Sequence, residues 1–304
     1  MQSDNNLPWR PGEQGDNPPE QFAGETPHPE DGLSFCSQCG SDWDMDQNYC
    51  PDCGYLSAGI VAQDVGRPSK KARLRMGAVP WGGWQISAGI IVVMISLFAS
   101  AAAAFAIGSL YPEQEDAVAT WISVHMMGIA IVATIWFLGL RHSRYPLAVL
   151  RLSRVRWPRT RTVLLMFGVL GASLIATSVY SIIVESLGLD RFTTPDVESD
   201  IFFDGAAVLL TFQALAFITP LSEELFFRGF IFRGLLPKIG PWGAIALSAL
   251  IFSAFHLSLG VVVPIFITGF LFAWLYWRTG SLWAAIGAHA GQNALALGVQ
   301  ALAG

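Results

Sequence analysis

The chain has 304 residues, of which 53% are hydrophobic and 13% are charged, and its formal net charge is −5. Soluble domains carry about 25% charged residues, so this composition excludes an ordinary soluble globular protein and favours a membrane protein. Twelve of the 23 acidic residues precede residue 76. The negative net charge therefore belongs mostly to a polar N-terminal region and predicts little about partners.

Four segments are expected in chain order. Residues 1–32 are rich in Pro, Gly, Asp, Glu, Asn and Gln and are predicted to be a disordered tail, because they cannot bury a core. Residues 33–56 form a compact cysteine module, and residues 57–80 form a linker that ends in a basic cluster. Residues 81–304 form the membrane domain.

The cysteine module contains two Cys-x2-Cys pairs that are ten residues apart, and its cysteines are Cys36, Cys39, Cys50 and Cys53. This spacing predicts a zinc ribbon, since two such pairs let four thiolates reach one tetrahedral Zn²⁺. Two redox or disulfide pairs are the alternative, which a reducing cytoplasm disfavours. We expect the zinc to be structural and the ribbon to dock a protein partner or regulate the membrane domain.

The membrane domain is predicted to be all-α and polytopic, with about seven transmembrane helices. Each apolar segment is near or above the ~17–25 residues that a spanning helix needs. The segments are 84–110, 120–140, 162–187, 205–222 (with a possible extension to 236), 242–259, 261–277 and 281–302.

The charges between these segments predict their orientation. Seven arginines and no acid fall between Arg141 and Arg161, and Arg228, Arg233, Lys238 and Arg278 mark later connections. The opposite connections are acidic, so the positive-inside rule places the N-terminus in the cytoplasm. The cluster at 141–161 is interpreted as a topology signal, with a surface for anionic lipid as the alternative.

Glu223 and Glu224 are adjacent in a strongly apolar tract, and they are the only acids after Gly205. Ionised carboxylates at membrane depth cost several kcal/mol on most estimates and are kept where something pairs with them or uses them. Arg228 lies one helical turn after Glu224 and is expected to pair with it. Glu223 lacks a partner in its own helix and is the first candidate for a chemical role.

Two further pairs of residues follow at a spacing of four, which places each pair on one helix face and predicts that the first residue packs one helical turn before the second. They are Phe252 with His256, and His289 with Asn293. Each element alone has a structural alternative, because a single intramembrane His or Asn is often a hydrogen-bonding link between helices. Their combination with the glutamates on successive segments favours a functional site. His125 has no such polar motif near it in the sequence and is interpreted as structural.

The order EExxxR, FxxxH and HxxxN on C-terminal membrane helices resembles the CPBP family of intramembrane proteases, which includes the CAAX prenyl endopeptidases and bacteriocin-processing proteins. The resemblance covers about residues 162–302, and all three motifs match. It implies an intramembrane endopeptidase in which Glu223 activates a water with help from His256. It also implies that His289 and Asn293 stabilise the oxyanion and that Glu224 and Arg228 support the site.

One geometric condition follows from the predicted segments. Glu223 falls near the cytoplasmic end of its segment and His256 near the outer end of the next. They can meet only if the helix from about 203 to 236 is long and tilted, or if residues 223–240 re-enter the membrane.

Two other functions stay open. A metal-dependent protease would use Glu223, His256 and His289 as ligands, although the HExxH signature is missing, and we expect no catalytic metal and no cofactor-binding residues. A non-enzymatic scaffold or immunity protein would use the zinc ribbon as its working module. We expect a peptide or membrane-protein substrate, the bilayer of a prokaryotic plasma membrane as the environment, and no nucleic-acid partner.

Overall fold

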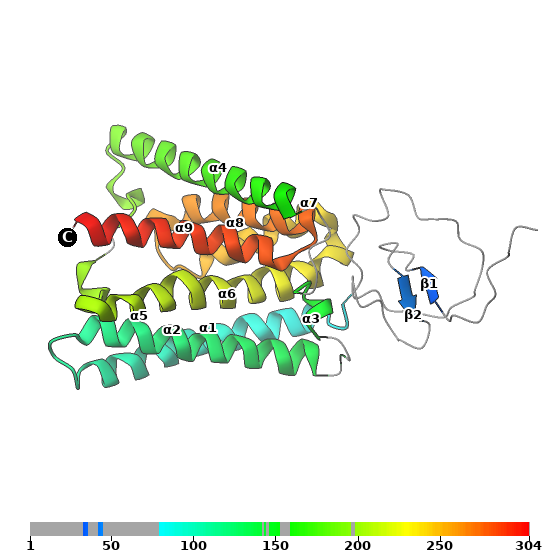
Figure 1. Cartoon of the computed structure of the whole chain (residues 1–304), viewed down its shortest axis with the longest axis horizontal. Helices are drawn as coiled ribbons and strands as arrows, with labels where there is room; N and C mark the ends of the chain where they lie inside the picture. The colour runs from blue at the N-terminus through cyan, green and yellow to red at the C-terminus, as the bar shows by residue number, and fades with distance from the viewer. Residues whose placement is uncertain are drawn as a thin grey trace, which may run out of the picture.

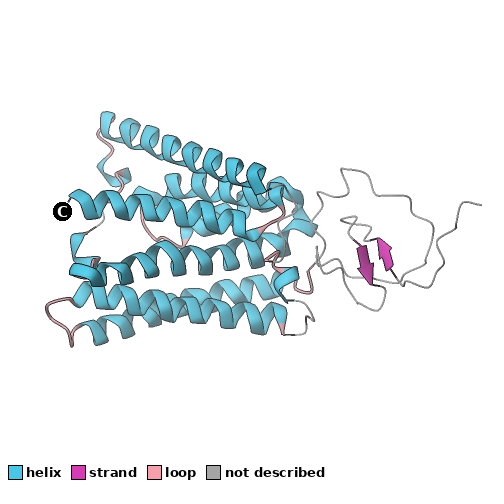
Figure 2. Cartoon of the chain, in the orientation of Figure 1, coloured by secondary structure: helices cyan, strands magenta, loops and turns pink. Residues whose placement is uncertain are grey.

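The computed structural model of the chain describes residues 33–35, 42–44, 79–141, 143, 146–152, 159–195 and 198–303. Two short strands, β1 (Leu33–Phe35) and β2 (Asp42–Asp44), pair in antiparallel register. The other regular elements of the described chain are helices (Figures 1 and 2). The four cysteines of the predicted zinc ribbon lie outside the described residues, so the ribbon stays a prediction.

The first membrane helices form an antiparallel pair. Helix α1 (Gly83–Gly108) is followed by α2 (Glu115–Ile135), which the π-helix η2 (Trp136–Leu140) extends (Figure 1). The pair needs a glycine at its turn, because a Cβ atom on Gly108 would lie 2.8 Å from the carbonyl oxygen of Glu115. The short α3 (Pro146–Val149) leads toward α4 (Arg159–Ser186).

A nearly continuous helical run from Gly205 to Ala254 forms the centre of the bundle. Two π-helices interrupt it on either side of the paired glutamates, and such π segments are frequent at functional sites. The run comprises η5 (Gly205–Ala207), α5 (Val208–Phe212), η6 (Gln213–Ile218), α6 (Thr219–Glu224), η7 (Leu225–Phe232) and α7 (Arg233–Ala254).

The run reverses its direction inside α7. Gly240 has φ 71° and ψ 176°, a conformation outside the helical region that glycine adopts readily. The chain then returns along the bundle to Ala254. Helices α8 (Leu259–Thr279) and α9 (Leu282–Ala303) complete the bundle, and Gly280 between them is left-handed with φ 66°. The short 3-10 helices η3 (Asp190–Phe192) and η4 (Ser199–Ile201) lie in the connection after α4.

Five helical intervals in the described part of the chain are long and apolar enough to cross a membrane. They are Gly83–Gly108, Glu115–Leu140, Thr160–Ser186, Gly205–Ala254 and Leu259–Thr279. This number does not confirm the predicted seven spans, because the two segments on either side of Gly240 form one interval and α9 is not among the five. Large apolar side chains such as Phe98, Phe167 and Ile182 are exposed on α1 and α4, as lipid-facing helices require.

The reversal at Gly240 explains how Glu223 and His256 reach the same depth in the bundle. Glu223 lies 17 residues before Gly240 and His256 lies 16 residues after it. With a rise of ~1.5 Å per residue, both side chains are about 25 Å along the bundle from the reversal. The long-helix possibility is therefore the one that brings Glu223 and His256 to the same level.

Two of the cations expected in connections lie instead in the interior. Arg228 and Arg233 have no exposed surface, so their prediction as markers of a connection was wrong. Arg233 donates a hydrogen bond from Nη1 to the carbonyl oxygen of Val149. Lys238 is exposed beside the reversal, as expected.

Helix η7 is the most enclosed element of the bundle, and all of its eight residues are buried. Phe226, Phe230 and Phe232 are fully buried, and the carbonyl oxygen of Phe230 accepts a hydrogen bond from Nε1 of Trp81 at 3.0 Å. This contact ties the start of the membrane domain to the segment that directly follows the paired glutamates.

Candidate active site

The two glutamates at the end of α6 have different environments. Successive residues of an α-helix point in directions about 100° apart, so the two carboxylates cannot share one face. Glu224 is fully buried, whereas the side chain of Glu223 keeps 22% of its surface exposed. The two acids therefore differ in exposure, and their separate roles stay a prediction.

Glu224 is held by two donors. Its Oε1 atom accepts hydrogen bonds from Nη1 of Arg228 at 2.8 Å and from Nδ1 of His289 at 2.9 Å. The pairing of Glu224 with Arg228 is as predicted. Arg228 also donates from Nη2 to the carbonyl oxygen of Gly269 at 3.0 Å, and its guanidinium carbon lies 4.5 Å from the centroid of the Phe252 ring. These contacts neutralise the buried charge, which is the condition for keeping it there.

His289 connects the two glutamates. A carboxylate accepts but cannot donate, so Nδ1 of His289 carries the hydrogen that binds Glu224. The other ring nitrogen, Nε2, lies 3.7 Å from Oε2 of Glu223. In the neutral ring this Nε2 is an acceptor. The rings of Phe272 and Phe252 lie 5.2 and 6.0 Å from the imidazole centroid and enclose it.

His256 lies just past the end of α7. Its Nδ1 is 3.0 Å from the carbonyl oxygen of Phe252, so this nitrogen is the donor and Nε2 of the neutral ring is an acceptor. The predicted packing of Phe252 one turn before His256 is confirmed, with ring centroids 5.1 Å apart. The next residue, Leu257, has φ 51° and helps end the helix.

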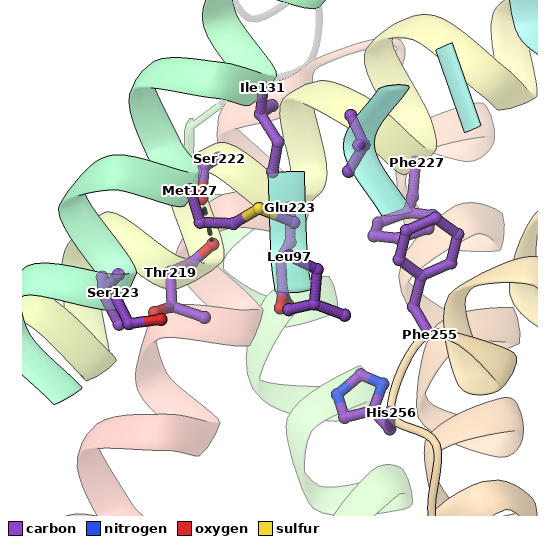
Figure 3. A pocket seen from close by; sticks show the side chains of 12 residues that line it. Leu97, Ser123, Met127, Ile131, Thr219, Ser222, Glu223, Phe227, Phe255 and His256 are labelled. Atoms are coloured by element: carbon purple, nitrogen blue, oxygen red, sulfur yellow. Dashed lines mark hydrogen bonds between the residues drawn. The ribbon is translucent and has the colours of Figure 1, made fainter. Parts of the chain in front are cut away.

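A cavity of about 250 Å³ lies between α1, α2, α6, η7 and the end of α7. Figure 3 shows Glu223 between Thr219 and Ser123 on one side and His256 and Phe255 on the other. Most of the other residues that line the cavity are apolar, namely Val93, Leu97, Val124, Met127, Ile131 and Phe227. A carboxylate and an imidazole thus open into a largely apolar space inside the bundle.

Asn293 makes a different contact from the one that its expected role requires. Its Nδ2 donates to the carbonyl oxygen of Leu215 in η6 at 2.8 Å. Neither Asn293 nor His289 is among the described residues that line the cavity. The structure therefore brings Glu223 and His256 to the cavity. His289 lies beside Glu223 but does not line the cavity, and Asn293 packs against the neighbouring π-helix η6.

His125 takes part in a separate polar group. Its Nδ1 donates to the carbonyl oxygen of Trp121 at 2.7 Å, and its Nε2 lies 3.1 Å from Nε2 of Gln213. Gln213 also accepts from Nε1 of Trp121 at 3.1 Å. These bonds join α2 to η6, which agrees with the structural interpretation of His125.

Thr219 and Ser123, two residues not predicted from the sequence, line the cavity with Glu223. Thr219 precedes Glu223 by one helical turn, so its spacing could have indicated a shared face. Ser123 lies on α2, and the sequence carries no signal that would bring it to the site. Among the described residues, no three His, Cys, Asp or Glu side chains are grouped as metal ligands would be.

Comparison with known proteins adds two observations. Residues 205–295 match the family model of type II CAAX prenyl endopeptidase Rce1-like proteins. A segment of 87 residues is 36% identical to "Putative membrane peptidase YdiL" of Bacillus subtilis (strain 168), and it covers 29% of this chain and 36% of that protein. No solved structure matches the chain.

The segment matched by the family model extends from the start of η5 into α9, so it contains both glutamates, Arg228, both site histidines and Asn293. It excludes α1 and α2, which supply half of the cavity wall. The chain is thus an apolar, helical membrane protein whose last third carries a domain similar to membrane endopeptidases.

Proposed function

We propose that the protein is an intramembrane endopeptidase that hydrolyses a peptide bond with a water activated by Glu223. The observation that carries this proposal is the contrast between the paired acids. Glu224 is neutralised in the interior by Arg228 and His289, while Glu223 faces the cavity with His256. A carboxylate that opens into a largely apolar cavity, where it can accept a proton, is the group that a general base requires.

In the proposed reaction, a water in the cavity donates one hydrogen to Glu223 and the other to Nε2 of His256. Glu223 takes the first proton while the water oxygen forms a bond to the carbonyl carbon. The π electron pair of the carbonyl moves onto its oxygen and makes a tetrahedral oxyanion. When the carbonyl re-forms, the C–N bond breaks, and the proton held by Glu223 passes to the leaving amine.

His289, Glu224 and Arg228 are proposed to position the base. The Nδ1 contact to Glu224 orients the His289 ring so that Nε2 faces Glu223. Such buried partners fix the geometry of a catalytic group by locking its orientation. The contacts of His289 and Asn293 support this positioning role better than the direct oxyanion role that the family resemblance implies.

The substrate is proposed to be a peptide or a membrane protein, because the apolar cavity wall favours a segment that partitions into the bilayer. The proposed orientation keeps the basic connections and the zinc ribbon in the cytoplasm. The ribbon is proposed to hold structural zinc through Cys36, Cys39, Cys50 and Cys53 and to bind a protein partner.

The test is cleavage of a fluorogenic peptide library by purified protein in proteoliposomes, comparing wild type with Glu223→Gln. Glu185→Gln is the matched control, since Glu185 is exposed at the end of α4 and outside the cavity. We expect cleavage by wild type and the control and loss of cleavage in Glu223→Gln at an unchanged melting temperature. Equal cleavage by Glu223→Gln would refute the glutamate mechanism, and no cleavage by any variant would favour the non-enzymatic scaffold.

A further inference from the structure

A polar cluster outside the cavity joins three helices that are distant in the sequence. The hydroxyl oxygen of Ser173 on α4 lies 2.7 Å from Oγ1 of Thr268 on α8 and 2.8 Å from Oε1 of Gln292 on α9. Ser173 is fully buried and Thr268 is 4% exposed. None of the three is among the described residues that line the cavity, and the proposed reaction uses none of them directly.

The donors and acceptors of this cluster have one consistent arrangement. An amide oxygen only accepts, so Ser173 donates its hydroxyl hydrogen to Gln292. A hydroxyl carries a single hydrogen, so the Thr268 hydroxyl donates to the oxygen of Ser173. Hydrogen bonds of this kind link helices within a membrane. Because Ser173 is the shared member, alanine at this position would remove the hydrogen bonds from α4 to both helices.

The two helices that the cluster joins to α4 both carry residues of the candidate site. On α8, Thr268 directly precedes Gly269, whose carbonyl oxygen accepts a hydrogen bond from Arg228 at 3.0 Å. On α9, Gln292 lies three residues after His289, which is less than one helical turn. The cluster therefore sets the separation of α8 and α9 close to the contacts that hold the buried carboxylate.

Helix α4 also supports α9 from the side that faces away from the glutamates. It lies beside α8 and α9 (Figure 1). A Cβ atom on Gly287 would overlap Cε of Met166, and one on Gly291 would lie 3.5 Å from Cδ2 of Leu170. Residues two positions apart on a helix point in directions about 200° apart, so His289 lies on nearly the opposite side of α9. Helix α4 thus limits how far α9 can move away from the glutamates.

We propose that Ser173 is a positioning residue, whose hydrogen bonds to Thr268 and Gln292 hold α9 where His289 contacts both glutamates. This inference rests on the proposed endopeptidase function. Without the Ser173 hydroxyl, α9 shifts, the Nδ1 contact of His289 to Glu224 lengthens, and Nε2 turns away from Glu223. A misplacement of about 1 Å caused by a change far from the reacting atoms can lower the rate by on the order of 100-fold.

The experiment compares wild type, Ser173→Ala, Ser173→Thr and the control Ser248→Ala in the proteoliposome assay. Ser248 is an equally buried serine on α7, but its hydroxyl donates within its own helix to the carbonyl oxygen of Ile245 at 3.2 Å. We expect Ser173→Ala to lower kcat by about 10- to 100-fold. KM should change little, because Ser173 does not line the cavity. Ser173→Thr keeps the hydroxyl and should retain most of kcat, and Ser248→Ala should match wild type.

The melting temperature separates positioning from a general structural role. Removing these interhelical hydrogen bonds should lower the melting temperature by only a few degrees, so kcat is compared per folded protein well below it. Wild-type kcat in Ser173→Ala, or a folded Ser173→Thr that is as slow as Ser173→Ala, would overturn the proposal. If either Ser173 variant does not fold, the isosteric Thr268→Val should lower kcat and the hydroxyl-retaining Thr268→Ser should not. Equal kcat in these two variants would then overturn it.

A double-mutant cycle tests whether Ser173 acts through His289. If it does, Ser173→Ala should lower kcat in wild type but have little further effect in His289→Ala. Additive losses would overturn this link. Wild-type kcat in Ser173→Ala, with Glu223→Gln inactive, would overturn the inference and leave the proposed function standing. Full activity of Glu223→Gln would instead refute the proposed function itself.

Discussion

Nδ1 of His289 donates to Oε1 of Glu224 over 2.9 Å and joins two residues that are 65 positions apart in the sequence. Arg228 donates to the same oxygen from the following turn of the helix. The buried acid is thereby held by one local and one distant partner, and its neighbour Glu223 is left to face the cavity. This division of two adjacent acids is the structural basis of the proposed mechanism.

Arg228→Met is expected to destabilise the protein by about 3–5 kcal/mol, because it leaves the buried charge of Glu224 without its main partner. The measurement is the free energy of unfolding in detergent micelles. Arg141→Met is the control, since Arg141 is exposed at the end of η2. The double variant Glu224→Gln/Arg228→Met should recover part of the loss. Equal stability of Arg228→Met and Arg141→Met would contradict the prediction.

Gly269→Ala is expected to lower stability by about 1–3 kcal/mol through overpacking. A Cβ atom there would lie 2.8 Å from Cδ1 of Phe252, and the shift of the ring would also disturb the guanidinium of Arg228 above it. Gly168→Ala on α4 is the matched control, because no atom lies within 4 Å of its added methyl. Thermal unfolding of both variants should give shifts of opposite sign, since alanine favours a helix over glycine by about 1 kcal/mol.

His256→Ala is expected to lower kcat by about 10²- to 10⁴-fold, the usual contribution of a group that assists proton transfer. The loss follows from removal of the Nε2 acceptor that faces the cavity. His125→Ala is the control, because His125 also donates from Nδ1 to its own helix but is not among the residues that line the cavity. Similar losses of kcat in the two variants, measured per folded protein, would show that the cavity position of His256 is unimportant.

Leu97→Trp is expected to raise KM or abolish cleavage by filling the cavity of about 250 Å³ from the α1 side. The same substitution at Ile95, which is 64% exposed on the outer face of α1, should be tolerated in the membrane. Steady-state kinetics in proteoliposomes provide the comparison. If both tryptophan variants behave as wild type does, the substrate does not occupy this cavity.

The local features of the site could be predicted from the sequence because helix geometry determines them. The Glu224–Arg228 pair and the packing of Phe252 against His256 each join residues four positions apart, and this spacing meets on one face of any helix. The apolar segments likewise predicted a helical membrane domain. The charge of the connections was a weaker guide: it located Lys238 near a reversal but also assigned Arg228 and Arg233 to connections, although both are buried.

The long-range features were decided only by the tertiary structure. Gly240 turns the chain so that Glu223 and His256 reach the same depth. The packing of α9 against α6 and η6 directs His289 to both glutamates and Asn293 to Leu215. Neither contact follows from a local spacing, because each depends on where helices distant in sequence place their faces.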